Sequence, residues 1–305
     1  MNAGLVSTII PVYNRPALLR EAVASVVAQT YRPIEIIVVD DGSTDDTPAA
    51  IAELASAHPE IRTLRIDNSG PGAAREAGRH IARGEFIQHL DSDDLLRPRR
   101  FELLIAALRE HPEAGVAYGM TRYCDLAGNE IAATWKDPNQ KQETMFPSFL
   151  LHRWWDTPSP LYRRSVTDAA GPWTSLRIEE DWEYDARVAA LGTRLTFVPE
   201  VLIDVRMHDE GHDRGLLRDR ARAHELIAQH ARRAGVPAKS PEMRHFARDL
   251  FHLARQCGAA GLRDEAKRLL ELAGEIAPRW DMRIYALAAR VIGWRNAARL
   301  GERLR

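Results

Sequence analysis

The feature that most constrains the fold is an alternation of apolar strands with helices along the first third of the chain. Four short runs rich in Ile, Val and Leu predict buried strands, at residues 5–10, 34–39, 61–66 and 84–90. The segments between them predict helices, at residues 16–27, 45–57 and 73–82. Short connections between these elements favour βαβ units and a parallel sheet with right-handed crossovers. The predicted fold class is therefore α/β.

The composition suits an ordinary soluble protein. The 305 residues fit one large domain or one domain with an appendage, and 45% of them are hydrophobic. Cys124 and Cys257 lie far apart, which fits a reducing compartment and offers no zinc spacing. No signal-peptide pattern follows Met1, and no apolar run reaches the ~18 residues of a membrane span. We therefore predict a cytoplasmic protein without a nucleic-acid partner.

Carboxylates gather directly after the fourth predicted strand. Asp91, Asp93 and Asp94 fall within four residues, at the carboxyl end of residues 84–90. In open parallel sheets this end is where ligands bind, and clustered carboxylates favour a hard cation such as Mg²⁺ or Mn²⁺. The chain has no G-x-G-x-x-G after its first strand and no G-x-x-x-x-G-K-[ST] anywhere. These absences argue against a dinucleotide dehydrogenase and a P-loop enzyme.

Six short motifs mark residues 5–210, at 8–14, 38–45, 72–75, 90–94, 180–183 and 205–208. In order and spacing they resemble family 2 glycosyltransferases with the GT-A fold, a Rossmann-like nucleotide-diphospho-sugar transferase fold. The resemblance implies that a sugar passes from a nucleotide-sugar, usually a UDP-sugar, to an acceptor hydroxyl with inversion, aided by Mn²⁺ or Mg²⁺. The chain lacks the Q-x-x-R-W motif of processive members. We therefore expect a non-processive hexosyltransferase.

The D-x-D motif of that family resembles Asp91-Ser92-Asp93. The resemblance makes Asp93 a metal ligand and places Asp91 at the ribose or a metal-bound water, with Ser92 in the nucleotide-sugar site. His208 matches a histidine that binds the metal or touches the diphosphate, and an imidazole ligand favours Mn²⁺. The alternatives are a solvated acidic turn that caps the next helix, and a structural histidine. Helix capping is the use we expect for Asp94.

The nucleoside pocket is expected around the first two strand ends. By the resemblance, Tyr13 stacks on the base, Asp41 accepts a hydrogen bond from it, and Pro11 lies where the backbone approaches it. Asn14 and Asp40 belong to the same nucleotide-sugar site. The structural alternatives are a turn for the two aspartates and a half-buried core ring for Tyr13.

Arg75 lies one helical turn into the helix that follows residues 61–66. It can support Asp41 or face the diphosphate, and a structural salt bridge is an equally good account.

A second acidic cluster predicts the catalytic base. Glu179, Glu180 and Asp181 precede a strongly helical segment. The resemblance assigns the base to Asp181, which takes the proton of the acceptor hydroxyl, and leaves Glu180 as the second candidate. Capping of the helix and stabilisation of its dipole is the alternative, above all for Glu179.

Aromatic side chains mark the expected acceptor side. Trp154 and Trp155 form an adjacent pair, and Trp182 directly follows the proposed base. Tryptophan faces often stack on sugars, so all three are candidate acceptor-binding residues for a glycan or a lipid-linked acceptor. Packing in a core or an interface is the equal alternative.

The domain prediction divides the chain near residue 213. Residues 1–213 form the GT-A domain, with nucleotide binding in 1–121 and acceptor binding in 122–213, and residues 214–305 form a helical region. Residues 215–305 of that region carry 19 Lys or Arg against 10 Asp or Glu. Its last predicted helix, about 281–304, sets Ile284, Leu287 and Val291 among arginines. Peripheral contact with the inner membrane face is one reading, and packing on its own domain is the other.

Two other functions compete with sugar transfer. A nucleotidyltransferase shares a similar sheet but requires a Gly-rich N-terminal loop with a catalytic Lys or Arg, where this chain has Pro11-Val12-Tyr13-Asn14. A non-catalytic module that binds nucleotide-sugars predicts the loss of a metal or base residue, and the candidate carboxylates are all present. The identity of the sugar, the acceptor and the oligomeric state are left open.

Overall fold

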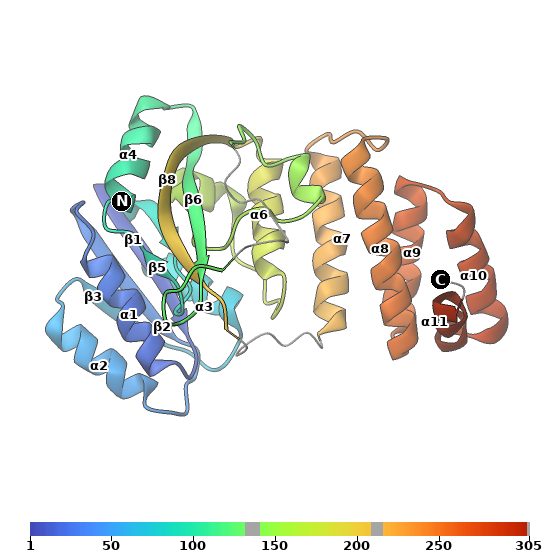
Figure 1. Cartoon of the computed structure of the whole chain (residues 1–305), viewed down its shortest axis with the longest axis horizontal. Helices are drawn as coiled ribbons and strands as arrows, with labels where there is room; N and C mark the ends of the chain where they lie inside the picture. The colour runs from blue at the N-terminus through green and yellow to red at the C-terminus, as the bar shows by residue number, and fades with distance from the viewer. Residues whose placement is uncertain (132–140, 209–215, 304–305) are drawn as a thin grey trace. The chain divides into compact units, whose positions relative to one another are not determined.

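The computed structural model describes residues 1–131, 141–208 and 216–303, and the chain forms two compact units (Figure 1). The first, here called the sheet unit, consists of Met1–Met145, Arg153–Arg177 and Leu191–Gly211. The second, the helical unit, consists of Phe146–His152, Ile178–Ala190 and His212–Arg305. The units therefore do not follow chain order, because two short segments from the middle of the sequence group with the C-terminal helices.

A mixed sheet of eight strands, in the order β3-β2-β1-β4-β7-β6-β8-β5, forms the sheet unit. The strands are β1 (Asn2–Val12), β2 (Ile34–Asp40), β3 (Ile61–Arg65), β4 (Gly84–His89), β5 (Leu95–Leu96), β6 (Ala114–Cys124), β7 (Pro160–Arg163) and β8 (Arg194–Arg206). Its helices are α1 (Pro16–Val27), α2 (Thr47–Ala57), α3 (Pro71–Ile81), α4 (Arg100–Glu110) and α5 (Arg164–Ala170).

The predicted parallel half of the sheet is confirmed. Strands β1 to β4 pair in parallel, with Ile9 of β1 opposite Ile37 of β2 and His89 of β4. Strand β1 runs on through Pro11 to Val12, beyond the predicted strand at residues 5–10. All seven residues of β2 are buried, as is typical of a strand with both faces covered.

Alternating residues of β1 pack on opposite faces of the sheet. Val6 and Ile10 join one apolar core with residues of α1 and α4. Ile9 points to the other face, where α3 packs on β1 and β2. A Cβ at Gly78 of α3 would lie 2.5 Å from Ile9 Cγ2, so only glycine lets this helix approach the strand so closely.

The other half of the sheet departs from the expected parallel order. Strand β7 lies antiparallel between β4 and β6, and β6 pairs with β8 in parallel. The apolar residues 195–198 and 201–205, whose pattern alone predicts two short strands, form the single irregular strand β8. The pairing register of β8 shifts opposite Gly119 and Met120. A bulge of this kind lets one strand continue past the residues that interrupt its apolar pattern.

The helical unit contains η1 (Ser148–Leu150), α6 (Glu180–Ala190), α7 (Leu217–Arg233), α8 (Pro241–Ala260), α9 (Arg263–Ile276), α10 (Trp280–Ile292) and α11 (Trp294–Arg303). Its core joins Leu150 and Ala186 to apolar residues of α7 to α11. The last predicted helix is in fact two helices, because Gly293 adopts a left-handed φ of +82° between them. No helix among the described residues is long and apolar enough to cross a membrane.

The predicted division near residue 213 lies in a segment, 209–215, outside the described residues. Helix α6, which we had placed in the GT-A domain, groups with the helical unit. The nucleotide-binding and acceptor-binding roles of the two parts of residues 1–213 stay predictions.

Candidate active site

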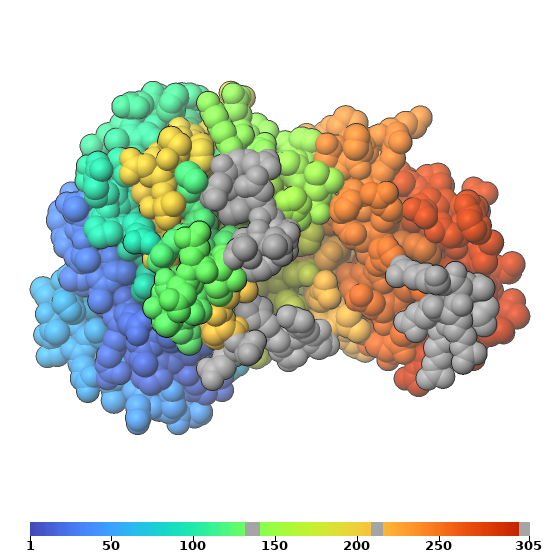
Figure 2. All heavy atoms as spheres, viewed as in Figure 1, coloured from blue at the N-terminus to red at the C-terminus, as the bar shows by residue number. Residues whose placement is uncertain are grey.

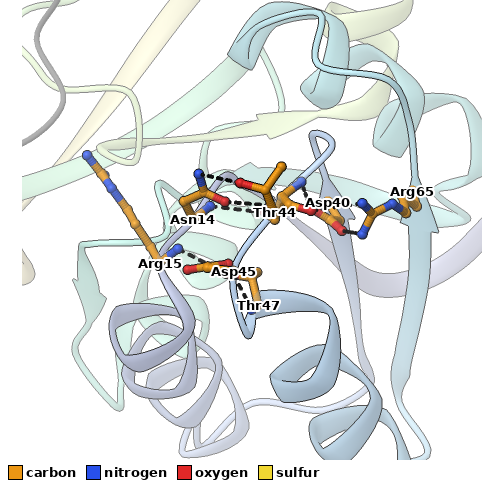
Figure 3. A network of polar contacts seen from close by, with 8 residues as sticks. Asn14, Arg15, Asp40, Thr44, Asp45, Thr47 and Arg65 are labelled. Carbon is orange, nitrogen blue, oxygen red and sulfur yellow. Dashed lines mark hydrogen bonds and ion pairs between the residues drawn. The ribbon is translucent and has the colours of Figure 1, made fainter.

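Two loops at the carboxyl edge of the sheet are bonded to each other (Figure 3). Asn14, which follows β1 with a left-handed φ of +54°, accepts a hydrogen bond at Oδ1 from the Thr44 backbone N–H, 2.8 Å away. Its own N–H donates to Ser43 Oγ over 3.0 Å. Asparagine tolerates the left-handed region because its short amide can bond locally. Asn14 thus fixes the loop that carries Tyr13, a residue that is 45% exposed and accessible to a stacking partner.

Asp40 and Asp41 are both buried and bonded to the loops around them. Asp40 accepts from the Ser43 N–H at 2.8 Å and from Arg65 Nη1 at 2.6 Å. Asp41 accepts from the backbone N–H groups of Ser69 and Gly70, at 2.7 and 2.9 Å. These contacts match the turn-forming alternative for both residues. Each carboxylate oxygen retains a second lone pair, so the recognition of a base by Asp41 stays a prediction.

Arg75 is bonded to the first aspartate of the D-x-D sequence. Its Nη2 lies 2.7 Å from Asp91 Oδ1, and its guanidinium lies 4.9 Å from the centre of the Trp173 ring. The arginine side chain is 4% exposed and that of Asp91 is 29% exposed. Arg75 therefore neutralises Asp91 from the protein side and leaves part of the carboxylate open.

Two side chains converge on Asp93 Oδ2. Nε2 of His208, two residues after β8, lies 2.9 Å away, and Nη1 of Arg15, at the start of α1, lies 2.5 Å away. A carboxylate and an imidazole in contact are a donor pair that suits Mn²⁺. Among the described residues no group of three His, Cys, Asp or Glu forms a complete metal cage. A cation bound by one or two protein groups together with phosphate oxygens requires no such cage, so the pair fits it.

Asp94 ties the D-x-D loop to β8. Its Oδ1 accepts a hydrogen bond of 2.9 Å from the Arg206 backbone N–H, and Arg206 Nε donates to the Asp93 carbonyl. Burial and the neighbouring charges of Asp93 and Asp91 raise the pKa of Asp94 well above its usual value. The expected helix cap is wrong: Asp94 holds the strand end that presents His208. Arg15 and Arg206 were not assigned roles from sequence, although each lies next to or within a motif.

The second acidic cluster belongs to the helical unit. Glu179 adopts a left-handed φ of +58°, and its Oε1 accepts from Arg220 Nε at 2.9 Å. His224 Nδ1 lies 2.9 Å from the other oxygen of Glu179 as an ion-pair contact, while it bonds the Arg220 carbonyl at 3.0 Å. Glu180 is 5% exposed and Asp181 is half-buried. The side-chain contacts of Glu179 are structural, but they join it to Arg220 and His224 of α7 and do not cap its own helix as we had weighed.

The candidate acceptor-binding tryptophans are packed against other aromatic rings. Trp154 and Trp155 are 4% and 0% exposed and lie 5.4 and 5.6 Å from the Tyr118 ring. Trp182, half-buried, donates from Nε1 to the Phe149 carbonyl at 3.1 Å and lies edge-on to His224. Burial of the adjacent pair leaves no ring face on the surface for a sugar, so the packing alternative accounts for Trp154 and Trp155.

The structure brings most of the predicted residues of the sheet unit to one edge. Tyr13, Asp41, Asp91, Asp93 and His208 all follow the carboxyl ends of β1, β2, β4 and β8. Ser92, 5% exposed, belongs to the same loop as Asp91, whereas Pro11 is a buried residue within β1. Asp181, Glu180 and Trp182 belong to the helical unit.

Comparison with known proteins identifies the family of the chain. The sequence model of Glycosyl transferase family 2 matches residues 7–168. A chondroitin synthase of Escherichia coli is 34% identical over 148 residues, which are 48% of this chain and 22% of that protein.

Among solved structures, S. aureus TarS 1-349 in complex with UDP-GlcNAc has a TM-score of 0.72 at 19% identity, covering 96% of this chain and 89% of that one. Mannosyltransferase PcManGT from Pyrobaculum calidifontis in complex with GDP-Man and Mn²⁺ has a TM-score of 0.53 at 21% identity, covering 97% and 86%. At these identities the likeness shows the fold. With a family match over more than half of its length and the GT-A fold, the chain belongs to glycosyl transferase family 2.

Proposed function

We propose that the protein is a metal-dependent, inverting, non-processive hexosyltransferase that moves a sugar from a nucleotide-sugar to an acceptor hydroxyl. The observation that carries the proposal is the contact of Asp93 Oδ2 with His208 Nε2, 2.9 Å apart, from segments 115 residues apart in sequence. Family membership supports sugar transfer, and this pair supports the metal.

The residues at the sheet edge account for donor binding. Tyr13, exposed on a loop that Asn14 fixes, is suited to stack on the base, a contact worth ~1–3 kcal/mol in comparable systems. Asp93 and His208 would hold Mn²⁺ or Mg²⁺. The cation supplies positive charge to the departing nucleoside diphosphate. Arg15, already at Asp93, supplies a second positive group to the same region.

Asp181 is the proposed base, with Glu180 as the second candidate. Its carboxylate would take the proton of the acceptor hydroxyl as the oxygen attacks the anomeric carbon, and a single displacement inverts that carbon. Asp181 is half-buried at the start of α6, whereas Glu180 is buried, and access favours Asp181. The assignment rests on its place in the family motif.

A UDP-sugar is the favoured donor. The TarS complex contains UDP-GlcNAc, and the PcManGT complex contains GDP-Man and Mn²⁺, so GDP-sugars are the second choice. We propose a glycan or lipid-linked acceptor in cell-surface polysaccharide or glycoconjugate synthesis, on the cytoplasmic side. The E. coli relative is named as a chondroitin synthase, but the matched residues span 22% of it.

The alternatives make different predictions for the same site. A non-catalytic module needs no base, yet Asp181 is present together with Asp93 and His208. A nucleotidyltransferase would release pyrophosphate and form a nucleotide-sugar. The loop at residues 11–14 has no glycine and no basic residue for that reaction.

Thermal-shift measurements with UDP, GDP, dTDP and ADP, each with and without Mn²⁺, test the proposal. We expect one diphosphate to raise the Tm, and to do so more with Mn²⁺. The protein is then incubated with the matching nucleotide-sugar and a cell extract as the source of acceptor, and the release of nucleoside diphosphate is measured. Release of pyrophosphate from a nucleoside triphosphate and a sugar 1-phosphate, or no binding of any diphosphate with the metal, would contradict the proposed function.

A further inference from the structure

Helix α10 has apolar side chains on two opposite faces. Met282, Tyr285 and Ala289 are buried at one face and join the core of the helical unit. Trp280, Ile284, Leu287 and Val291 recur at helical spacing on the other face and are 75%, 58%, 63% and 75% exposed. At 3.6 residues per turn these four side chains form one stripe about 16 Å long. A helix that only packs on its own domain needs the first face but not the second.

The position of α10 explains why the second face is open. Helices α7, α8, α9 and α10 follow one another from left to right in Figure 1, and α10 contacts α9 and α11. The red atoms of α10 lie at the surface of the molecule in Figure 2. Outer faces of terminal helices in such stacks are normally polar, because they face water. An exposed row of four large apolar side chains indicates contact with something apolar.

Arginines line one edge of the stripe. Helical spacing places Arg283 beside Trp280 and Leu287, and Arg290 beside Leu287, and both arginines are exposed. Neither has an ion-pair partner among the residues that the structure describes, whereas Arg279 bonds Asp281 at 2.7 Å. The edge therefore carries two positive charges that no carboxylate of the described chain neutralises.

A groove opens beside this edge, between α9 and α10. Its volume is about 540 Å³, and Arg279, Arg283 and Arg290 line it together with Lys267 and Glu271. Lys267 Nζ lies 3.9 Å from the Glu271 carboxylate, so the surplus charge of the groove is on the arginine side. An apolar stripe next to a cationic groove matches the two parts of an anionic phospholipid, its acyl region and its phosphate.

We infer that this surface, here called the α10 face (Trp280, Ile284, Leu287, Val291, Arg283 and Arg290), binds the surface of a membrane that contains anionic phospholipid. The apolar stripe enters the boundary between headgroups and acyl chains, and the arginines contact lipid phosphates. The charge of the edge selects an anionic bilayer over a second copy of this chain, because two copies of the α10 face would bring like charges together.

Vesicle flotation of the full-length protein tests the inference. We expect binding to vesicles of phosphatidylglycerol and phosphatidylcholine, and at least about tenfold weaker binding to phosphatidylcholine alone. Ile284→Ser with Leu287→Ser should lower the partition coefficient at least about tenfold. Arg283→Gln with Arg290→Gln should lower it about tenfold on anionic vesicles and little on neutral ones.

Two matched control variants distinguish binding through the α10 face from non-specific binding to vesicles. Leu126→Ser with Leu191→Ser removes leucines of similar exposure, 50% and 48%, from the sheet unit. Arg233→Gln with Arg244→Gln removes two exposed charges from α7 and α8 of the helical unit. Both pairs should bind vesicles like the wild type.

Three results would overturn the inference: equal flotation of all variants, concentration-dependent dimers that the Ile284/Leu287 change abolishes without any vesicle binding, or binding of inorganic phosphate without vesicle binding. Circular dichroism and Tm establish that each variant is folded. Because the α10 face contains none of the proposed donor-site or base residues, transfer to a soluble acceptor should be unchanged in all variants.

Discussion

The two acidic clusters look alike in sequence, but the structure uses their carboxylates differently. At the end of β4, the side chains of Asp91 and Asp93 are 29% and 18% exposed and contact arginines and a histidine at the sheet edge. The second cluster continues into the first turn of α6 with Glu183, which is 1% exposed and whose Oε1 lies 3.1 Å from His230 Nε2 of α7. Carboxylates at a strand end thus retain surface for a ligand, whereas those inside a helix-packing interface hold helices together.

This difference indicates which carboxylates of an acidic cluster are available for chemistry. Glu179 and Glu183 are bound by Arg220, His224, Arg187 and His230 within the helical unit. Asp181, on the same turn of α6, is half-buried and accepts from the Trp182 N–H at 2.7 Å. The second cluster therefore separates structural carboxylates from one suited to proton transfer.

The largest expected effect is at Asp181. Asp181→Asn should lower kcat about 10²–10⁴-fold, because the amide cannot accept the acceptor's proton, while nucleoside diphosphate binding is unchanged. The measurement is steady-state transfer together with calorimetric binding. The matched change Glu180→Gln should have a much smaller effect. A larger loss in Glu180→Gln than in Asp181→Asn would move the base to Glu180.

The next effect concerns the first cluster. Asp93→Asn should lower transfer about 10²–10³-fold and abolish the increase in diphosphate binding that Mn²⁺ gives, because a charge that stabilises the metal is lost. Binding isotherms at several Mn²⁺ concentrations measure this. Asp125→Asn, which removes a charge from an exposed turn of the same unit, is the control. Metal-dependent binding as strong as in the wild type would remove Asp93 from the metal site.

A smaller effect, on stability alone, tests whether the buried carboxylate of Glu183 holds the helices of the helical unit together. Glu183→Ala should lower the free energy of unfolding by about 3 kcal/mol, because it leaves Arg187 and His230 without their buried carboxylate. Glu275→Ala breaks an exposed ion pair with Arg232 and should cost less than about 1 kcal/mol. Urea unfolding measures both. Equal losses of unfolding free energy in the two variants would show that the burial of Glu183 adds nothing to stability.

The smallest expected effect is a pH dependence of stability that comes from His89, a buried residue two positions before Asp91. His89, 1% exposed, lies 4.9 Å from the Trp173 ring, and burial with the charges of Arg75 and Arg79 holds its pKa well below 6.5. Below pH 6.5 the unfolded chain binds a proton at His89 that the folded protein does not. Stability therefore falls as pH falls below 6.5, by up to about 1.4 kcal/mol per pH unit from this group.

His89→Phe should reduce that slope, measured by urea unfolding at a series of pH values below and above 6.5. His111→Phe is the control, since His111 is exposed and its pairing with Glu113 lies at the surface. An unchanged slope in His89→Phe would assign the pH dependence to another group.

Local patterns predicted the parallel half of the sheet and the motifs at its edge. Most of β1 and all of β2 are buried, because both of their faces are covered, whereas β3, at the edge of the sheet, alternates buried or half-buried and exposed residues. Local patterns indicate β7 only weakly, since Pro160–Arg163 is four residues long and its antiparallel partners are distant in sequence. The break at Gly293 was missed because an isolated glycine is compatible with a helical pattern.

The sequence by itself determined the fold class, the family and the residues at the strand ends, because strand periodicity and motif order are local properties. Only the tertiary structure decided their partners: Asp93 with Arg15 and His208, and Asp94 with the end of β8. It also showed that Trp154 and Trp155 are buried and that α10 leaves an apolar face open. Contacts and burial depend on which distant segments pack together, and no local pattern specifies that.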